Sequence, residues 1–232
     1  MKLQYGFLTL LILLIASCGP REGAVDATVI RPTKILDFKT LYSENCAGCH
    51  GREGKGGVAI ALGDAVYLAL ADDQVLRNTT AKGVPGTAMP AFAQSSGGFL
   101  TDQQIDAIVT GIRGWAKPGF LSDANPPPYT APTPGDPTRG AATYTTYCAS
   151  CHGADGKGSD HASSIVDPAF LTLVSDQSLR TTVIVGRPEM GAPDWRGDVS
   201  GKPLSPEQVS DVVAWLSAQR PPNSPKLVGG VR

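Results

Sequence analysis

Two five-residue stretches, Cys46-Ala47-Gly48-Cys49-His50 and Cys148-Ala149-Ser150-Cys151-His152, share the pattern Cys-x-x-Cys-His. Of the five cysteines in the 232 residues, only Cys18 lies outside them. Two thiols one helical turn apart can reach the two vinyl groups of one porphyrin, and the next residue can place an imidazole beneath its iron. Each stretch therefore predicts one covalently attached haem c. The predicted attachment residues are Cys46, Cys49, Cys148 and Cys151, and the predicted iron ligands are His50 and His152.

Three other uses of paired cysteines remain open on the sequence alone. Two pairs could share one zinc ion, but the two histidines and a gap of about a hundred residues fit a zinc site poorly. A redox dithiol of thioredoxin type requires a βαβ context, and none is visible. Structural disulfides occur in exported proteins, yet a bridge across so short a loop is strained.

The similarity between the two halves extends well beyond these stretches, at an offset close to 102 residues. Tyr42 and Tyr144 each lie four residues before the first cysteine of their half. Further matches are Gly51, Gly54 and Lys55 with Gly153, Gly156 and Lys157, residues 73–77 with 176–180, and Gly83-x-Pro85 with Gly186-x-Pro188. The chain is thus a tandem duplication of one module.

The methionines of the repeat predict the sixth ligand of each iron. Apart from the initiator, the chain contains only Met89 and Met190, which follow His50 and His152 by 39 and 38 residues. A lone methionine is more often a core residue, but Gly- and Pro-rich loops at matching positions rarely supply core packing. We therefore expect His/Met coordination, which favours ferrous iron and gives a higher potential than bis-histidine coordination.

Each half resembles a class I cytochrome c domain, and the whole chain is similar to tandem dihaem cytochromes such as the cytochrome c4 group. The resemblance covers about residues 35–116 and 138–220 and rests on the haem stretches, the repeat and the two methionines. It implies an all-α fold of two tandem class I cytochrome c domains, each a small helical bundle around one covalent haem. The motifs specify haem attachment closely and the physiological role only weakly.

Local signals mark the first and last helices of each half. Apolar residues at helical spacing from Phe38 lead into the first haem stretch. Capping boxes begin at Thr101 and at Ser205, and each precedes an apolar stripe at a period of three to four residues. We expect a helix to begin after each of these two residues.

The resemblance also implies that the first and last helices of a domain cross closely, often with a small residue against an aromatic one. In the second half Gly140 and Trp215 fit this pattern. The first half has Phe38 where Gly140 stands and Gly111 where Trp215 stands. We interpret this as a reciprocal exchange that conserves volume at the crossing.

The N-terminus is typical of an export signal. Lys2 is followed by the apolar run 7–15, which is too short to span a bilayer. Ile15-Ala16-Ser17-Cys18 resembles the lipobox of bacterial lipoproteins, so we expect a signal peptide over 1–17, lipidation of Cys18 and a flexible tether over 18–34. The protein would then be exported and anchored by lipid on the periplasmic side of a bacterial membrane. A secreted protein with an incidental cysteine is the alternative.

The remaining segments are a linker and a tail. Residues 117–137 contain seven prolines and predict an extended, semi-rigid linker, and residues 221–232 predict a flexible tail. A net charge of −1 gives no field that favours nucleic acid. Aromatic residues make up only 6% of the chain, so the cores are thin and a prosthetic group is expected to fill them.

Iron held by both His and Met has no open position, which favours electron transfer and makes an enzyme less expected. The donor would be a quinol-oxidising complex or a dehydrogenase, and the acceptor an oxidase or a reductase, in a respiratory or photosynthetic chain. A dedicated subunit of a larger oxidoreductase or terminal oxidase is the alternative, and an enzyme or sensor whose methionine dissociates is a third. His161, the one histidine outside the haem stretches, is expected in a surface loop, with ligation or proton transfer as alternatives.

Overall fold

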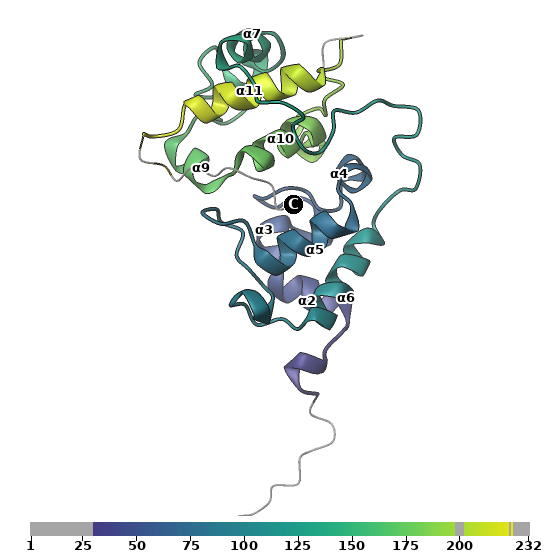
Figure 1. Ribbon diagram of the computed structural model, residues 1–232. Helices are drawn as coiled ribbons and strands as arrows, with labels where there is room; N and C mark the ends of the chain where they lie inside the picture. The colour runs from purple at the N-terminus through teal and green to yellow at the C-terminus, as the bar shows by residue number, and fades with distance from the viewer. Residues whose placement is uncertain (1–29, 198–201, 223, 225–232) are drawn as a thin grey trace, which may run out of the picture. The chain divides into compact units, whose positions relative to one another are not determined.

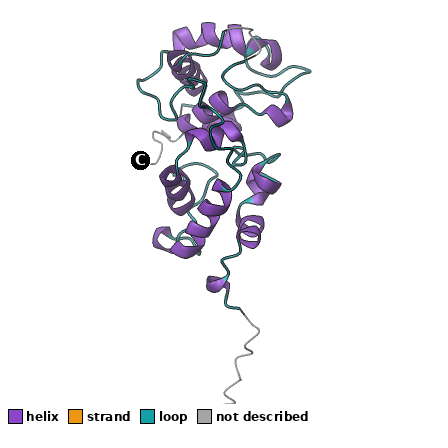
Figure 2. Ribbon diagram, turned by 90° about the vertical axis from the view of Figure 1, so that its right-hand side faces the viewer, coloured by secondary structure: helices purple, strands orange, loops and turns teal. Residues whose placement is uncertain are grey.

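The structure is a computed structural model that describes residues 30–197, 202–222 and 224. Within this part of the chain all regular elements are helical, with isolated β-bridges only (Figure 2). The predicted all-α fold is therefore confirmed. The chain divides into the units Met1–Lys34 and Ile35–Arg232, and both repeated halves lie in the second unit. The expected signal peptide and Cys18 lie outside the described residues.

Both halves run through the same order of helices. The first half contains α2 (Phe38–Asn45), α3 (Ala47–His50), α4 (Ala65–Leu70), α5 (Asp73–Lys82) and α6 (Asp102–Arg113). The second contains α7 (Pro137–Tyr147), α8 (Ala149–His152), α9 (Pro168–Leu173), α10 (Asp176–Val185) and α11 (Pro206–Ala218). Short 3-10 helices lie at Pro32–Lys34, Arg52–Gly54, Gln94–Ser96 and Pro188–Met190. No described helix has the length and apolar character needed to cross a membrane.

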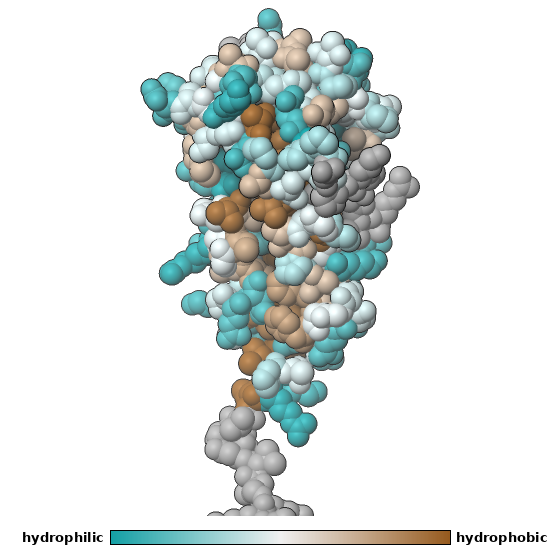
Figure 3. Space-filling view, turned by 90° about the vertical axis from the view of Figure 1, so that its left-hand side faces the viewer, coloured by the Kyte–Doolittle hydropathy of each residue, from teal (hydrophilic) through white to brown (hydrophobic). Residues whose placement is uncertain are grey.

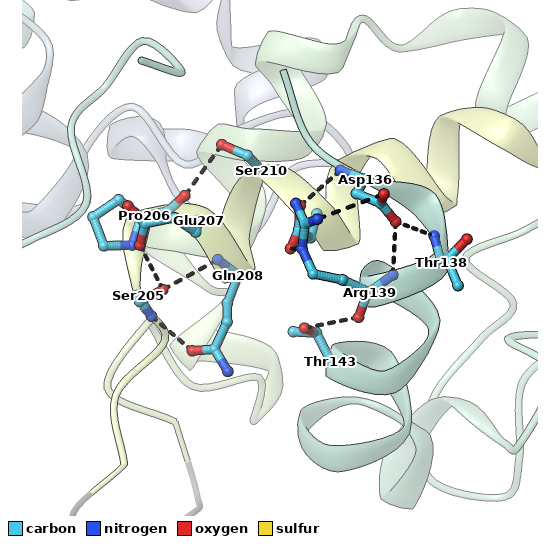
Figure 4. A network of polar contacts seen from close by, with 10 residues as sticks. Asp136, Thr138, Arg139, Thr143, Ser205, Pro206, Glu207, Gln208 and Ser210 are labelled. Atoms are coloured by element: carbon cyan, nitrogen blue, oxygen red, sulfur yellow. Dashed lines mark hydrogen bonds and ion pairs between the residues drawn. The ribbon is translucent and has the colours of Figure 1, made fainter. Parts of the chain in front are cut away.

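Side-chain caps fix where the long helices begin. The predicted capping boxes at Thr101 and Ser205 both form, so α6 and α11 begin as expected. Figure 4 shows the second, in which the Ser205 hydroxyl accepts from the Gln208 N–H at 3.2 Å and the Ser205 N–H donates to Gln208 Oε1 at 2.9 Å. The helix α7 begins at Pro137, a residue that the sequence had assigned to the linker. Proline suits this first position because its missing N–H would have no helical partner there.

The first and last helices of each half cross through a glycine, as predicted. A β-carbon on Gly140 would lie 2.0 Å from the Asp211 carbonyl oxygen and 2.8 Å from Trp215 Cβ, so α7 and α11 approach as closely as their backbones allow. In the first half a β-carbon on Gly111 would lie 2.1 Å from the Phe38 ring. The ring of α2 thus fills the space beside the glycine of α6, as the reciprocal exchange predicts. Figure 1 shows the backbones of α2 and α6 side by side.

An ion pair secures the crossing of α7 and α11. Arg139 donates to both carboxylate oxygens of Asp211, at 2.7 and 2.8 Å, and the Asp136 N–H donates to the same carboxylate at 2.7 Å. Figure 4 shows Arg139 close to Asp136 and Thr138 at the start of α7. The Asp211 side chain is only 5% exposed, whereas Arg139 remains largely in solvent. The hydrogen bonds from Arg139 lower the pKa of Asp211, because they stabilise the ionised carboxylate.

The larger of two hydrophobic clusters spans both halves. It joins residues of the first half, such as Ile105 and Ile108, to Ile184, Trp195 and Val209 of the second. The smaller cluster lies entirely in the second half and consists of Leu171, Leu179, Val213 and Leu216. The halves therefore pack against each other in addition to being joined by the linker.

The linker is held against the second half by a buried arginine. Arg180 of α10 is 2% exposed, and its guanidinium donates to the carbonyls of Pro128 and Tyr129 and to the Ser210 hydroxyl at 2.8–3.2 Å. Gln177 also donates to the Tyr129 carbonyl at 2.8 Å. The linker adopts no helix between residues 124 and 136, in agreement with its prolines.

Candidate haem-binding sites

In the first half, α2 leads directly into the haem stretch. Cys46 ends α2 and begins α3, and its carbonyl accepts from the N–H groups of Cys49 at 3.2 Å and His50 at 2.9 Å. The two thiols therefore stand one helical turn apart, with the imidazole next to the second. This is the local geometry that attachment to one porphyrin requires.

The second half repeats this arrangement with nearly the same dimensions. Cys148 ends α7 and begins α8, and its carbonyl accepts from Cys151 at 3.2 Å and from His152 at 2.9 Å. The N-caps of α2 and α7 are both aspartates, Asp37 and Asp136. The same local sequence signals thus build both sites.

Each histidine of the haem stretches is oriented by a backbone carbonyl. Nδ1 of His50 lies 2.8 Å from the Ile60 carbonyl, and Nδ1 of His152 lies 2.9 Å from the Ser163 carbonyl. A carbonyl can only accept, so Nδ1 must carry the proton and Nε2 retains its lone pair. Burial, partly opposed by the bond to Ile60, lowers the pKa of His50, which keeps the ring in the neutral form that binds a metal. Both rings are therefore prepared to ligate through Nε2.

The first thiol of each pair is protonated at neutral pH. Burial, with a smaller contribution from Cys49, raises the pKa of Cys46 to about 12, and burial with Cys151 raises the pKa of Cys148 to about 11. A redox dithiol needs an activated thiolate, which these environments disfavour. No disulfide joins any of these four cysteines, and no three His, Cys, Asp or Glu side chains of the described part of the chain gather into a metal site.

The two methionines lie in loops that close against a glycine at the end of the preceding helix. Gly83 caps α5 with a φ of 64°, and a β-carbon there would lie 2.7 Å from the Met89 carbonyl oxygen and 2.5 Å from the Pro90 carbonyl carbon. Gly186 caps α10 with a φ of 69°, and a β-carbon there would lie 2.2 Å from the Pro193 oxygen. Only glycine permits both the backbone angle and the close return of the loop.

The side chain of Met190 is not part of the protein core. This residue is 72% exposed, at the end of the 3-10 helix Pro188–Met190, and Met89 is half-buried. The alternative that Met190 is a packing residue is therefore wrong. The structure leaves the ligand role of both methionines as a prediction.

An aromatic pair stands behind each haem stretch. The Tyr42 hydroxyl donates to the Gly51 carbonyl at 3.0 Å, and the Tyr144 hydroxyl donates to the Gly153 carbonyl. Tyr144 stacks on Trp215 with ring centroids 4.2 Å apart, and Tyr42 meets Trp115 edge to face at 5.0 Å. These contacts give the repeated tyrosines a role in positioning the segment that follows each histidine.

The residues present fit a haem c in each half. Each half offers two adjacent thiols and an imidazole with a free Nε2, and its one methionine lies in a glycine-closed loop. Large apolar side chains are also exposed, including Val58 at 88%, Leu173 at 53% and Phe170 at 40%. Figure 3 shows such hydrophobic side chains at the surface between polar ones.

Sequence reasoning missed three groups at these sites. The carbonyls of Ile60 and Ser163 carry no side-chain signal, and they lie 10 and 11 residues after their histidines. Trp115 was also missed because it lies four residues beyond Gly111, the position that matches Trp215. His161 lies exposed in a loop, as expected, and its N–H donates to the Ser159 hydroxyl at 3.0 Å.

Comparison with known families gives one match that covers both halves. The family described as cytochrome c oxidase, cbb3-type, subunit III matches residues 34–110 and 135–216. These two segments contain both haem stretches and both methionines, and they cover more than half of the chain.

Several curated proteins are similar to the chain. The cbb3-type cytochrome c oxidase subunit CcoP of Azospirillum sp. (strain B510) is 30% identical over 52% of this chain and 40% of the relative. FixPc of Rhizobium leguminosarum bv. viciae, with the same subunit description, is 26% identical over 73% of this chain and 57% of the relative. The chain thus spans about half the length of these relatives. A solved structure from the Kuenenia stuttgartiensis reducing HAO-like protein complex is 17% identical, with a TM-score of 0.46, and covers 83% of this chain and 100% of that chain.

Proposed function

The chain belongs to the family of the cbb3-type cytochrome c oxidase subunit III, and from this premise we propose that it is an electron-transfer protein with two covalent haems c. The observation that supports the proposal most strongly is the repeated site. Both halves combine adjacent thiols, a histidine held through Nδ1 and a methionine in a glycine-closed loop. Two complete sets of ligands support two haems in preference to one.

The proposed attachment residues are Cys46 and Cys49 in the first half and Cys148 and Cys151 in the second, and the proposed axial ligands are His50 with Met89 and His152 with Met190. When bound, haem c supplies one-electron chemistry at its iron. The protein's residues orient the imidazoles, hold the methionine loops and exclude water from the site. With both axial positions filled by protein, no position is left for a substrate, so we propose no catalysis at either centre.

Two placements of this electron-transfer protein are distinguished by different observations. The family match and the oxidase-subunit descriptions of its relatives favour a dedicated subunit of a terminal oxidase complex. The tandem arrangement of two domains resembles the cytochrome c4 group. Together with the proposed lipid anchor, this arrangement favours a tethered carrier between redox proteins. We favour the oxidase subunit, because its support comes from similarity over both halves.

The membrane attachment is proposed separately from the redox function. The sequence Ile15-Ala16-Ser17-Cys18 supports cleavage before Cys18 and lipidation of its thiol, on the periplasmic side of a bacterial membrane. Mass spectrometry of the wild-type protein should then find an N-terminal peptide that begins at Cys18 and carries acyl chains, and a Cys18→Ser variant should lack them. A wild-type peptide that begins at Cys18 without acyl chains, or one that begins elsewhere, would contradict the lipid anchor.

A native gel of mildly solubilised membranes, stained for covalent haem, tests the function and the placement together. A haem-stained band in a large assembly that also contains oxidase subunits is the expected result. A small haem-stained band on its own would instead identify the tethered carrier. Absence of haem stain from a protein made with its export signal would contradict the proposed function itself.

A further inference from the structure

Each methionine loop forms a hydrogen bond with the opposite half of the chain. In the first half the Ala88 N–H donates to the Leu173 carbonyl, at the end of α9, at 3.3 Å. In the second half Nη2 of Arg187 donates to the Gly57 carbonyl at 2.6 Å. The two loops that carry the proposed sixth ligands therefore lie at the contact between the halves.

Arg187 is bound firmly to the second of these loops. Its N–H donates to the Ala192 carbonyl at 2.9 Å, and its own carbonyl accepts from Met190 at 2.8 Å and from Ala192 at 3.0 Å. Its guanidinium forms an ion pair with Glu189 at 2.7 Å, and the two side chains are only 18% and 24% exposed. Because the loop and the guanidinium are held together, movement of one displaces the other.

The acceptor of this bond lies directly against the first haem stretch. A β-carbon on Gly57 would lie 2.2 Å from the Cys49 carbonyl oxygen, 2.6 Å from the His50 carbonyl carbon and 2.4 Å from the Gly51 nitrogen. The segment that contains Gly57 also runs into Ala59, whose N–H donates to the Cys49 carbonyl at 2.9 Å. A displacement of the Gly57 carbonyl would therefore also displace the backbone of Cys49 and His50, which Gly57 contacts.

The contact breaks the symmetry of the repeat. Val84 follows Gly83 in the first half as Arg187 follows Gly186 in the second. Valine has no side-chain donor, so it cannot form the corresponding bond. A charged side chain, partly buried and shared between an acid and a carbonyl of the other half, is costly unless both partners are maintained. This residue therefore distinguishes the second methionine loop from the first.

We propose that Arg187 is a positioning residue that couples the two haem sites, because it ties the Met190 loop to the segment packed against His50. The inference rests on the proposed function, since it assigns a meaning to loops that are proposed to ligate iron. When the Met190 loop opens, the Gly57 carbonyl loses its charged donor, and the first site is loosened with the second. The two sites then respond together to a change in either ligand loop.

Hydrogen exchange of the haem-loaded full-length protein tests the contact directly. In Arg187→Gln, amides in residues 54–60 and 186–192 should both exchange about tenfold faster, the change expected for loss of one charge-assisted hydrogen bond. Lys157→Gln is the matched control, because Lys157 also pairs with an acid two residues away, Asp155, within the second half. Arg187→Lys keeps one donor and should show an intermediate rate. Faster exchange in 186–192 alone, or in neither segment, would overturn the proposal.

A redox titration of the same variants adds a readout that local stability does not supply. Arg187→Gln should shift both midpoint potentials, whereas Lys157→Gln should shift neither. The NMR resonances of the two axial methionines assign each midpoint potential to one half of the chain. A shift of the second-half potential alone would overturn the proposed coupling. Failure of the proposed function has a different signature, because the wild-type protein would then carry fewer than two covalent haems.

Discussion

The Phe38 ring of α2 packs directly against Gly111 of α6, and a β-carbon added to Gly111 would lie 2.1 Å from that ring. The first half thus carries its aromatic residue on the first helix and its glycine on the last. The second half reverses the pair, with Gly140 on the first helix and Trp215 on the last. Both arrangements join one glycine to one aromatic residue. The crossing that closes each domain is thus set by summed volume, and either helix can supply the larger side chain.

Replacement of Phe38 by Gly should destabilise the first half strongly. The half-buried ring contacts Gly111, Tyr42 and Trp115, so its removal leaves a cavity at the helix crossing and lowers the free energy of unfolding by about 2 kcal/mol or more. Thermal or denaturant unfolding measures the loss. Phe99→Ala is a control, because this side chain is 63% exposed. A loss well under about 1 kcal/mol for Phe38→Gly would contradict the exchange.

Gly186→Ala should displace the Met190 loop without removing the methionine. The added β-carbon would lie 2.2 Å from the Pro193 oxygen, and the backbone angle is also unfavourable for alanine. We expect loss of the absorption band of Met-ligated haem from one of two sites. Gly191→Ala is the matched control, because it has a φ of 84° but no atom within 4 Å of the new carbon. Equal effects of the two variants would show that backbone strain alone, and not the close loop, disturbs ligation.

Arg180→Ala should release the linker from the second half. It leaves the Pro128 carbonyl and the Ser210 hydroxyl without the Arg180 donor and the Tyr129 carbonyl with Gln177 alone, at a cost of about 2–4 kcal/mol. Limited proteolysis should then cut the linker faster. Arg77→Ala is the control from the matching repeat position, where the side chain is more exposed and its loss should cost at most about 1 kcal/mol. Similar proteolysis rates in the two variants would contradict the role of Arg180 in holding the linker against the second half.

The Asp211 carboxylate should contribute to stability above acid pH. Its pKa is lowered in the folded protein, so the contribution is fully present above the unfolded pKa of about 3.9 and is lost as pH falls through the lower folded value. Asp211→Asn should therefore be less stable than wild type at pH 7, and the difference should shrink on acidification below about pH 4. Unfolding measured across this range supplies the comparison. A difference that stays constant with pH would exclude the ionised pair with Arg139 as its source.

Much of the fold could be predicted because its signals are local. The capping boxes at Thr101 and Ser205 and the cysteines that end α2 and α7 are encoded within a few residues. Trp115 was missed because it lies in the turn after the end of α6, four positions beyond Gly111, so the repeat does not align it with Trp215 inside α11.

Contacts between distant segments could not be predicted from the repeat. Arg77 and Arg180 occupy the same repeat position, yet the first pairs with Asp102 and Asp106 while the second holds the linker. Their environments differ because Ser210 stands where Asp106 stands, and because the linker carbonyls of Pro128 and Tyr129 accept from Arg180. The bond from Arg187 to Gly57 likewise depends on how the halves pack, which no local pattern encodes.

The central claim is that each half carries one covalent haem c, and the intact mass of the exported protein tests it most directly. The account predicts a mass increase of two haem groups, reduced to one in a Cys148→Ser/Cys151→Ser variant and equally in a Cys46→Ser/Cys49→Ser variant. An increase of fewer than two haems in the wild-type protein, or an unchanged mass increase in either variant, would contradict it.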